Sequence, residues 1–216
     1  MGLACHIAKI HREASVERNA WELKQYIEEL YWGSGKRVLL LRHSKGGVDA
    51  AAALAIYSSA LKDKVAGLAL VQSPYGGTPI ASDILQASVA PGVLSTIYHV
   101  AHVELPWLPL PCFSNDELDS GQVGRKVPVV IPMAAAMAIC ALHLRFRYGE
   151  KSDGLVTCRD AEVRGSVVVQ PDQKLDHAWI SSGKKDTDDP DAFEMCEALF
   201  TLLVEIGNAK QERVEG

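Results

Sequence analysis

Two short apolar runs constrain the fold of this chain more than any other feature. The runs KRVLLL (36–41) and KVAGLALVQSP (64–74) are almost continuously apolar, and such runs are typical of strands that are covered on both faces. Between them, the alanine-rich stretch 46–61 favours a helix. Buried strands that alternate with helices predict an α/β protein with a mostly parallel sheet and helices on both of its faces.

The pattern predicts further elements on this framework. A helix is expected over 15–31, where Ser15 can cap the first turn, and a last helix over 190–206, followed by a frayed tail from Asn208. The stretch VPVVIPMAAAMAICAL is expected to be a buried strand that runs into a core helix. Third and fourth strands are predicted at VPVVIP (127–132) and GSVVVQ (165–170).

Residues 79–120 differ in composition from the rest of the chain. They hold several prolines and aromatic residues, which predicts an irregular insertion with short helices. His99 and His102 could share one helical turn there, but no third ligand accompanies them, so we expect no metal site. No repeat or linker divides the chain, and a single domain spanning 1–216 is therefore predicted.

Composition excludes several classes of function. The net charge is -5, with acidic and basic residues interleaved, which argues against a nucleic-acid surface. The longest apolar stretch, 127–142, is broken by two prolines and falls short of the roughly 20 residues of a membrane helix. The five cysteines form no C-x-x-C pair and are expected to be free thiols. We also expect no cofactor. The N-terminus shows no signal peptide, but a truncated start would have lost one, so the location is unknown and the cytoplasm is only the default.

The stretch RHSKGG (42–47) follows the first strand and begins the next helix. A sharp turn between a strand and a helix can lift Ser44 above the end of the sheet as a nucleophile, and the backbone N–H of Lys45 could then bind an oxyanion. Such a turn needs small residues on both sides of the serine. Gly46 meets this need, whereas Arg42 would add strain or point its guanidinium toward an acidic substrate group.

Two further polar residues come in the order that a serine-based triad requires. Asp153 is expected in a turn after the third strand, and His177 in a loop after the fourth. Each has a plainer interpretation, because Asp-Gly is a common turn and a loop histidine can simply bond its neighbour. Three other acids compete for the role of Asp153, namely Asp160, Asp172 and Asp176.

Four segments of the chain together resemble the lipase and esterase branch of the α/β-hydrolase fold, over most of residues 9–206. LLLRHSKGG resembles its nucleophile elbow, and SDGLV and LDHAW resemble the loops of its acid and its histidine. VQSPYGGTPIASDI resembles a segment that bacterial triacylglycerol lipases carry after the next strand. The resemblance implies that Ser44 is the nucleophile, His177 the general base and then acid, and Asp153 its orienting partner.

The resemblance also carries expectations about the rest of the chain. Residues 79–120 occupy the place of a lid or acyl-binding cap. Secreted bacterial lipases have a calcium-binding Asp two residues after the histidine, where this chain has Trp179, so no calcium site is expected. The strands that normally precede the helix 15–31, with their second oxyanion donor, are missing, which implies an N-terminal truncation. The strand at 36–41 would then be an edge open to self-association.

Three functions are consistent with these features. The first is a serine hydrolase that acts on carboxylic, lipid-like acyl esters through an acyl-enzyme. The second is a catalytically impaired or inactive hydrolase-like binding module, which Arg42 and the missing oxyanion loop favour. The third is acyl transfer by the same triad, which differs from hydrolysis only in the acceptor.

Overall fold

The two apolar runs form a pair of parallel strands, as predicted. In the computed structural model β1 (Val38–His43) pairs with β2 (Val65–Val71), and the register runs from Leu39 opposite Gly67 to His43 opposite Val71. The structure describes residues 4–11, 13–85, 133–170, 175, 177 and 192–215. Within these ranges the sheet has two strands, so β1 has no strand beyond it on its other side. Self-association through that edge stays a prediction.

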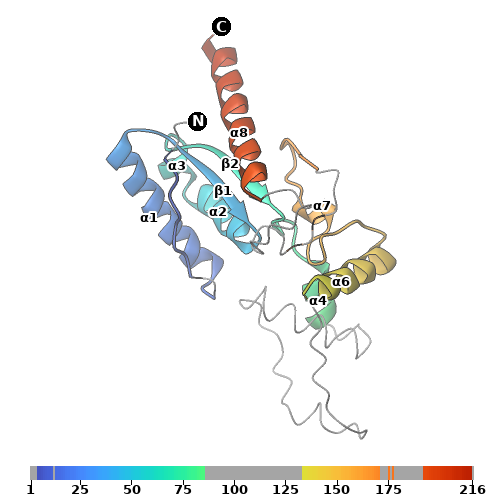
Figure 1. Ribbon diagram of the computed structural model, residues 1–216. Helices are drawn as coiled ribbons and strands as arrows, with labels where there is room; N and C mark the ends of the chain where they lie inside the picture. The colour runs from blue at the N-terminus through green and yellow to red at the C-terminus, as the bar shows by residue number, and fades with distance from the viewer. Residues whose placement is uncertain are drawn as a thin grey trace, which may run out of the picture.

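Helices lie on both faces of the strand pair (Figure 1). The described helices are α1 (Val16–Ser34), α2 (Lys45–Ile56), α3 (Ser58–Leu61), α4 (Pro79–Leu85), α6 (Met133–Tyr148), α7 (Cys158–Ala161) and α8 (Ala192–Glu215). Of these, α1 and α2 pack on one face of the strands and α8 on the other. Because side chains alternate along a strand, Leu39 and Leu40 point to opposite faces. Leu40 packs into the core with α1 and α2, whereas Leu39 and Leu203 of α8 both lie close to Gly67. The α/β architecture expected from the sequence is therefore present.

The core forms where α1 crosses α2 beside β1. Ala20, Leu23 and Ile27 of α1 are buried at helical spacing, and they meet Ala50 and Ala53 of α2. The small alanines let the two helix backbones approach closely. The cap of α1 is also as predicted, because the Ser15 hydroxyl accepts a hydrogen bond from the N–H of Arg18 (3.3 Å).

Helices α4 and α6 form a second packed unit. The buried carboxylate of Asp83 on α4 accepts hydrogen bonds from His143 Nε2 (2.7 Å) and from the Tyr148 hydroxyl (2.6 Å), both on α6. Figure 1 shows α4 and α6 side by side, as these bonds require. The contact fixes the end of α6, from which the chain turns into the loop that holds Asp153.

Several predicted elements differ from the structure. The fourth strand, GSVVVQ, is wrong, since the stretch is irregular and its three valines are 48–66% exposed; no neighbouring strand among the described residues offers hydrogen bonds to it. The helix over 46–61 is divided at Tyr57. The last helix continues through the tail that was expected to fray, reaching Glu215.

Other expectations fall partly or wholly outside the described residues. The third strand, 127–132, and most of the insertion 79–120 lie outside them, α4 being the described part of that insertion. Cys5, Cys140, Cys158 and Cys196 are free thiols, as predicted, and Cys112 is not described. Among the helices of the described ranges, none combines the length and the apolar character that a membrane crossing requires.

Candidate active site

Ser44 occupies a strained turn between β1 and α2. Its backbone has φ 51° and ψ -134°, a conformation that a residue with a side chain rarely adopts and that costs about 1–3 kcal/mol. Two hydrogen bonds hold it there, one from the Ser44 N–H to the carbonyl of Val71 (3.0 Å) and one from the Gly47 N–H to the carbonyl of Ser44 (2.9 Å). The serine therefore stands at the carboxyl end of the parallel strands, where the sequence places it.

The structure brings Ser44, His177 and Asp153 into one hydrogen-bonded chain. Nδ1 of His177 lies 2.9 Å from Oδ2 of Asp153, and Nε2 lies 2.8 Å from the hydroxyl oxygen of Ser44. An ionised carboxylate only accepts, so Nδ1 carries the proton and donates it to Asp153. Nε2 is then the acceptor for the Ser44 hydroxyl. The arrangement can take a proton from the serine.

Hydrogen bonds within its own loop orient the carboxylate of Asp153, independently of His177. Oδ1 of Asp153 accepts from the N–H groups of Leu155 (3.0 Å) and Val156 (2.8 Å), which leaves Oδ2 directed at His177. Gly154 has φ +109°, and a Cβ at that position would lie 2.8 Å from the carbonyl oxygen of Met137 on α6. The turn thus follows a helix and packs on it, and glycine is needed for both reasons.

His177 is fully buried and is held through its backbone as well as its ring. Its N–H donates to the carbonyl of Asp153 (2.9 Å), and its carbonyl oxygen lies 3.1 Å from Nε2 of His43. Burial and then electrostatic repulsion from His177 lower the pKa of His43 to about 4, although hydrogen bonds with the Gln72 side chain and the His177 backbone and the charge of Asp153 act to raise it. His43 was not among the residues predicted from the sequence, although its place directly before the serine was an available signal.

A buried polar cluster ties the first turn of α2 to α1. The Lys45 ammonium lies 2.9 Å and 3.0 Å from the two carboxylate oxygens of Asp49, and the side-chain amide of Asn19 donates to the same carboxylate (2.9 Å). Lys45 is also the first residue of α2, and the N–H groups of a first turn point out of the helix toward the serine. The i,i+4 spacing of Lys45 and Asp49 is a sequence signal for such an ion pair. Asn19 has no such signal, because it lies 30 residues from Asp49 in the chain.

Arg42 fits into the turn beside Gly46. A Cβ built on Gly46 would meet the Cδ of Arg42 at 3.9 Å, an ordinary contact distance, so we find no steric conflict between the two residues. Burial lowers the pKa of the guanidinium, and the charge of Asp49 and then that of Tyr26 oppose this shift. These neighbours belong to α2 and α1. The strain expected at Arg42 itself stays a prediction.

The close approach of strand and helix falls on Gly47 instead. A Cβ on Gly47 would overlap the buried Ser73 side chain, with Ser73 Cβ at 2.6 Å, and would lie 3.0 Å from Leu70. We expect Gly47→Ala to lower the free energy of unfolding by about 1–3 kcal/mol. Gly46→Ala is the matched control and should change it by less than about 1 kcal/mol, since alanine is favoured over glycine in helices. Equal urea midpoints for the two variants would contradict this account.

The rival residues lie elsewhere or outside the described ranges. Oδ2 of Asp160 accepts from the Thr157 hydroxyl (2.6 Å), and the Asp160 backbone carbonyl accepts from Gly76 (2.7 Å), so Asp160 supports a neighbouring turn. The remaining candidates named from the sequence are not described, namely Asp172, Asp176, His99, His102 and Trp179.

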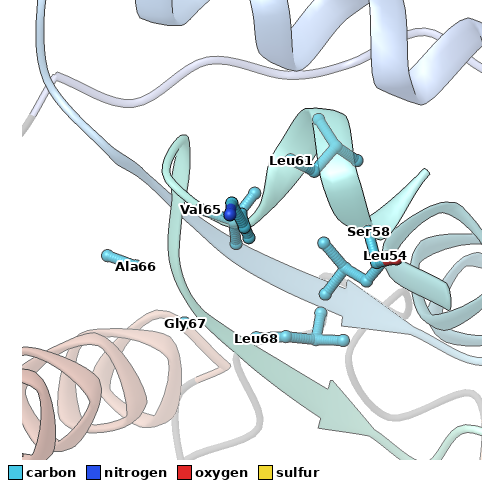
Figure 2. Close-up of a pocket in the computed structure, with 8 residues that line it drawn as sticks. Leu54, Ser58, Leu61, Val65, Ala66, Gly67 and Leu68 are labelled. Carbon is cyan, nitrogen blue, oxygen red and sulfur yellow. The ribbon is translucent and has the colours of Figure 1, made fainter.

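A shallow apolar hollow of about 300 Å³ lies at the opposite end of the strands. Figure 2 shows its lining from α2, α3 and the start of β2, including Leu54, Leu61 and Leu68. Ser44 bonds the last residue of β2, whereas this hollow surrounds the first ones. We therefore assign it no part in chemistry at Ser44.

Comparison with known proteins shows a likeness to a solved lipase structure. No protein-family model and no curated protein sequence matches the chain. Among solved structures it is similar to the mature form of the Bacillus licheniformis lipase BlEst2, at 18% identity, with a TM-score of 0.58, over 90% of this chain and 76% of that one. The propeptide form of that lipase aligns at 19% identity and a TM-score of 0.49, over 79% and 38% of the two chains. The likeness to the mature form shows that the fold is lipase-like.

Proposed function

We propose that this lipase-like chain is a serine hydrolase of carboxylic esters, with Ser44 as nucleophile, His177 as general base and acid, and Asp153 as the group that orients the histidine. The observation that carries the proposal is the unbroken set of hydrogen bonds from Asp153 through His177 to a serine held at positive φ. A structural serine has no need of a strained backbone or of a buried histidine–carboxylate pair.

The reaction follows from the proton positions in this chain. Nε2 of His177 removes the Ser44 proton as the serine oxygen attacks the ester carbonyl, and the backbone N–H of Lys45 donates to the oxygen that becomes negative. Asp153 stabilises the imidazolium without taking its proton. His177 then protonates the leaving alcohol, an acyl-enzyme remains on Ser44, and water activated by His177 releases the acid.

The same proposal includes the substrate class and the layout of the fold. We assign the substrate to acyl esters of lipid-like character and the chain to the triacylglycerol-lipase branch of the α/β-hydrolases, as one domain with a cap-like insertion at 79–120. Support comes from the resemblance of four sequence segments and from the fold likeness to a lipase. Activity on p-nitrophenyl esters of increasing chain length, rising from acetate to longer acyl groups, would test the lipid-like assignment.

Labelling with a fluorophosphonate probe tests the nucleophile. We expect wild-type protein to be labelled and Ser44→Ala to remain unlabelled, because the probe forms a covalent bond only with an activated serine. Ser58→Ala, a change at an exposed serine of α3, is the control and should label like the wild type. Wild-type protein that is folded but labels no better than Ser44→Ala would refute the hydrolase and leave the non-catalytic binding module.

A further inference from the structure

His43 lies where it can control the geometry of His177. It is the last residue of β1, directly before Ser44, and its Nε2 is 3.1 Å from the backbone carbonyl oxygen of His177. The two imidazole rings pack against each other, with centroids 5.0 Å apart and planes inclined by 40°. We propose that His43 is a positioning residue, which holds His177 at its working distance from Ser44 by donating a hydrogen bond to the His177 carbonyl. This inference rests on the proposed function.

The other hydrogen bonds of His177 show what the contact with His43 adds. Its N–H and its Nδ1 both reach Asp153, so these two bonds place the residue relative to the acid loop. The bond from His43 places it relative to β1, the strand that ends at the nucleophile. Because Ser44 and His43 are adjacent in the chain, any shift of β1 moves the serine and this anchor together. The distance between Ser44 and His177 is thereby kept constant.

The chemistry of the contact fixes the protonation of His43. A backbone carbonyl only accepts, so Nε2 of His43 must carry a proton and donate it. The neutral ring meets this need with one proton, at Nε2. A neutral His43 also suits its neighbour, since a charge 5.0 Å from the His177 ring would oppose the uptake of the serine proton. The position therefore requires a neutral donor.

A pair of variants separates the hydrogen bond from the bulk of the ring. His43→Leu keeps much of the side-chain bulk but removes the hydrogen-bond donor. His43→Gln can bring an amide N–H close to the position of Nε2. We expect His43→Leu to lower kcat for p-nitrophenyl ester hydrolysis on the order of 10²-fold with KM little changed, since a displaced base affects the chemical step. His43→Gln should recover most of that rate. His6→Leu, at an exposed histidine, should leave the rate unchanged.

Equal rates for the leucine and glutamine variants would overturn the inference, because a purely structural role does not distinguish donor from non-donor. A wild-type rate in His43→Leu would also overturn it. If neither variant folds, the ¹⁵N spectrum of the wild-type imidazoles decides, with a neutral ring protonated at Nε2 expected for His43 and one protonated at Nδ1 contradicting it. Failure of the proposed function is distinguishable, since it leaves wild-type Ser44 unlabelled whatever the tautomer of His43.

Discussion

Asp153→Asn is expected to lower kcat for ester hydrolysis by about 10⁴-fold while the protein stays folded. The reason is the direction in which the new amide must point. Two backbone N–H groups, of Leu155 and Val156, donate to Oδ1, so the asparagine must keep its oxygen there. Its NH₂ group then faces Nδ1 of His177, which becomes an acceptor. The proton of the imidazole moves to Nε2, where it blocks removal of the Ser44 proton.

Asp160→Asn is the matched control for this substitution. Asp160 bonds the Thr157 hydroxyl and its carbonyl accepts from Gly76, so its change should leave kcat within a few-fold of the wild type. Steady-state kinetics on a p-nitrophenyl ester, with circular dichroism of each variant, measures both effects. An Asp153→Asn enzyme that retains more than about a tenth of the wild-type kcat would show that this carboxylate does not orient the base.

Mild acid is expected to destabilise the fold through His43. Burial lowers the pKa of His43 from 6.5 to about 4 in the folded protein. Between these values the unfolded chain binds a proton that the folded chain does not, so stability falls as the pH falls through that range. The resulting loss is about 2 kcal/mol by pH 5 and about 3 kcal/mol by pH 4.

His43→Gln isolates this contribution, because glutamine does not titrate. Urea unfolding at pH 7 and at pH 5 should show a larger loss of stability for the wild type than for the variant, by about 2 kcal/mol. The titratable groups that face His43 are His177 and Asp153, and both remain in the variant. The same pH dependence in both proteins would mean that His43 titrates normally in the folded state.

The apolar runs and the serine turn were predictable because their signals are local. Continuous apolar runs indicated β1 and β2, the Ser15 cap marked the start of α1, and the serine of RHSKGG, with Gly46 and Gly47 close behind it, indicated the turn. The fourth strand failed for a physical reason. Val167, Val168 and Val169 have strand propensity, but a strand needs a partner for its backbone hydrogen bonds, and no described residue offers one.

The candidate site was likewise predictable in part from the sequence and in part only from the tertiary structure. The sequence by itself determined which residue types were available, namely a serine at a strand end, then an acid in a glycine turn, then a histidine. Only the tertiary structure decided that Asp153 and His177, which follow Ser44 by more than a hundred residues, meet it at hydrogen-bond distance.

Tertiary structure alone also assigned the supporting roles. It placed Nε2 of His43 at hydrogen-bond distance from the carbonyl oxygen of His177. It also showed that glycine is required at position 47, where Ser73 packs against the helix, and not at position 46 as the sequence suggested. Contacts of this kind depend on how strands, helices and loops pack together, and the period of a local sequence carries no information about them.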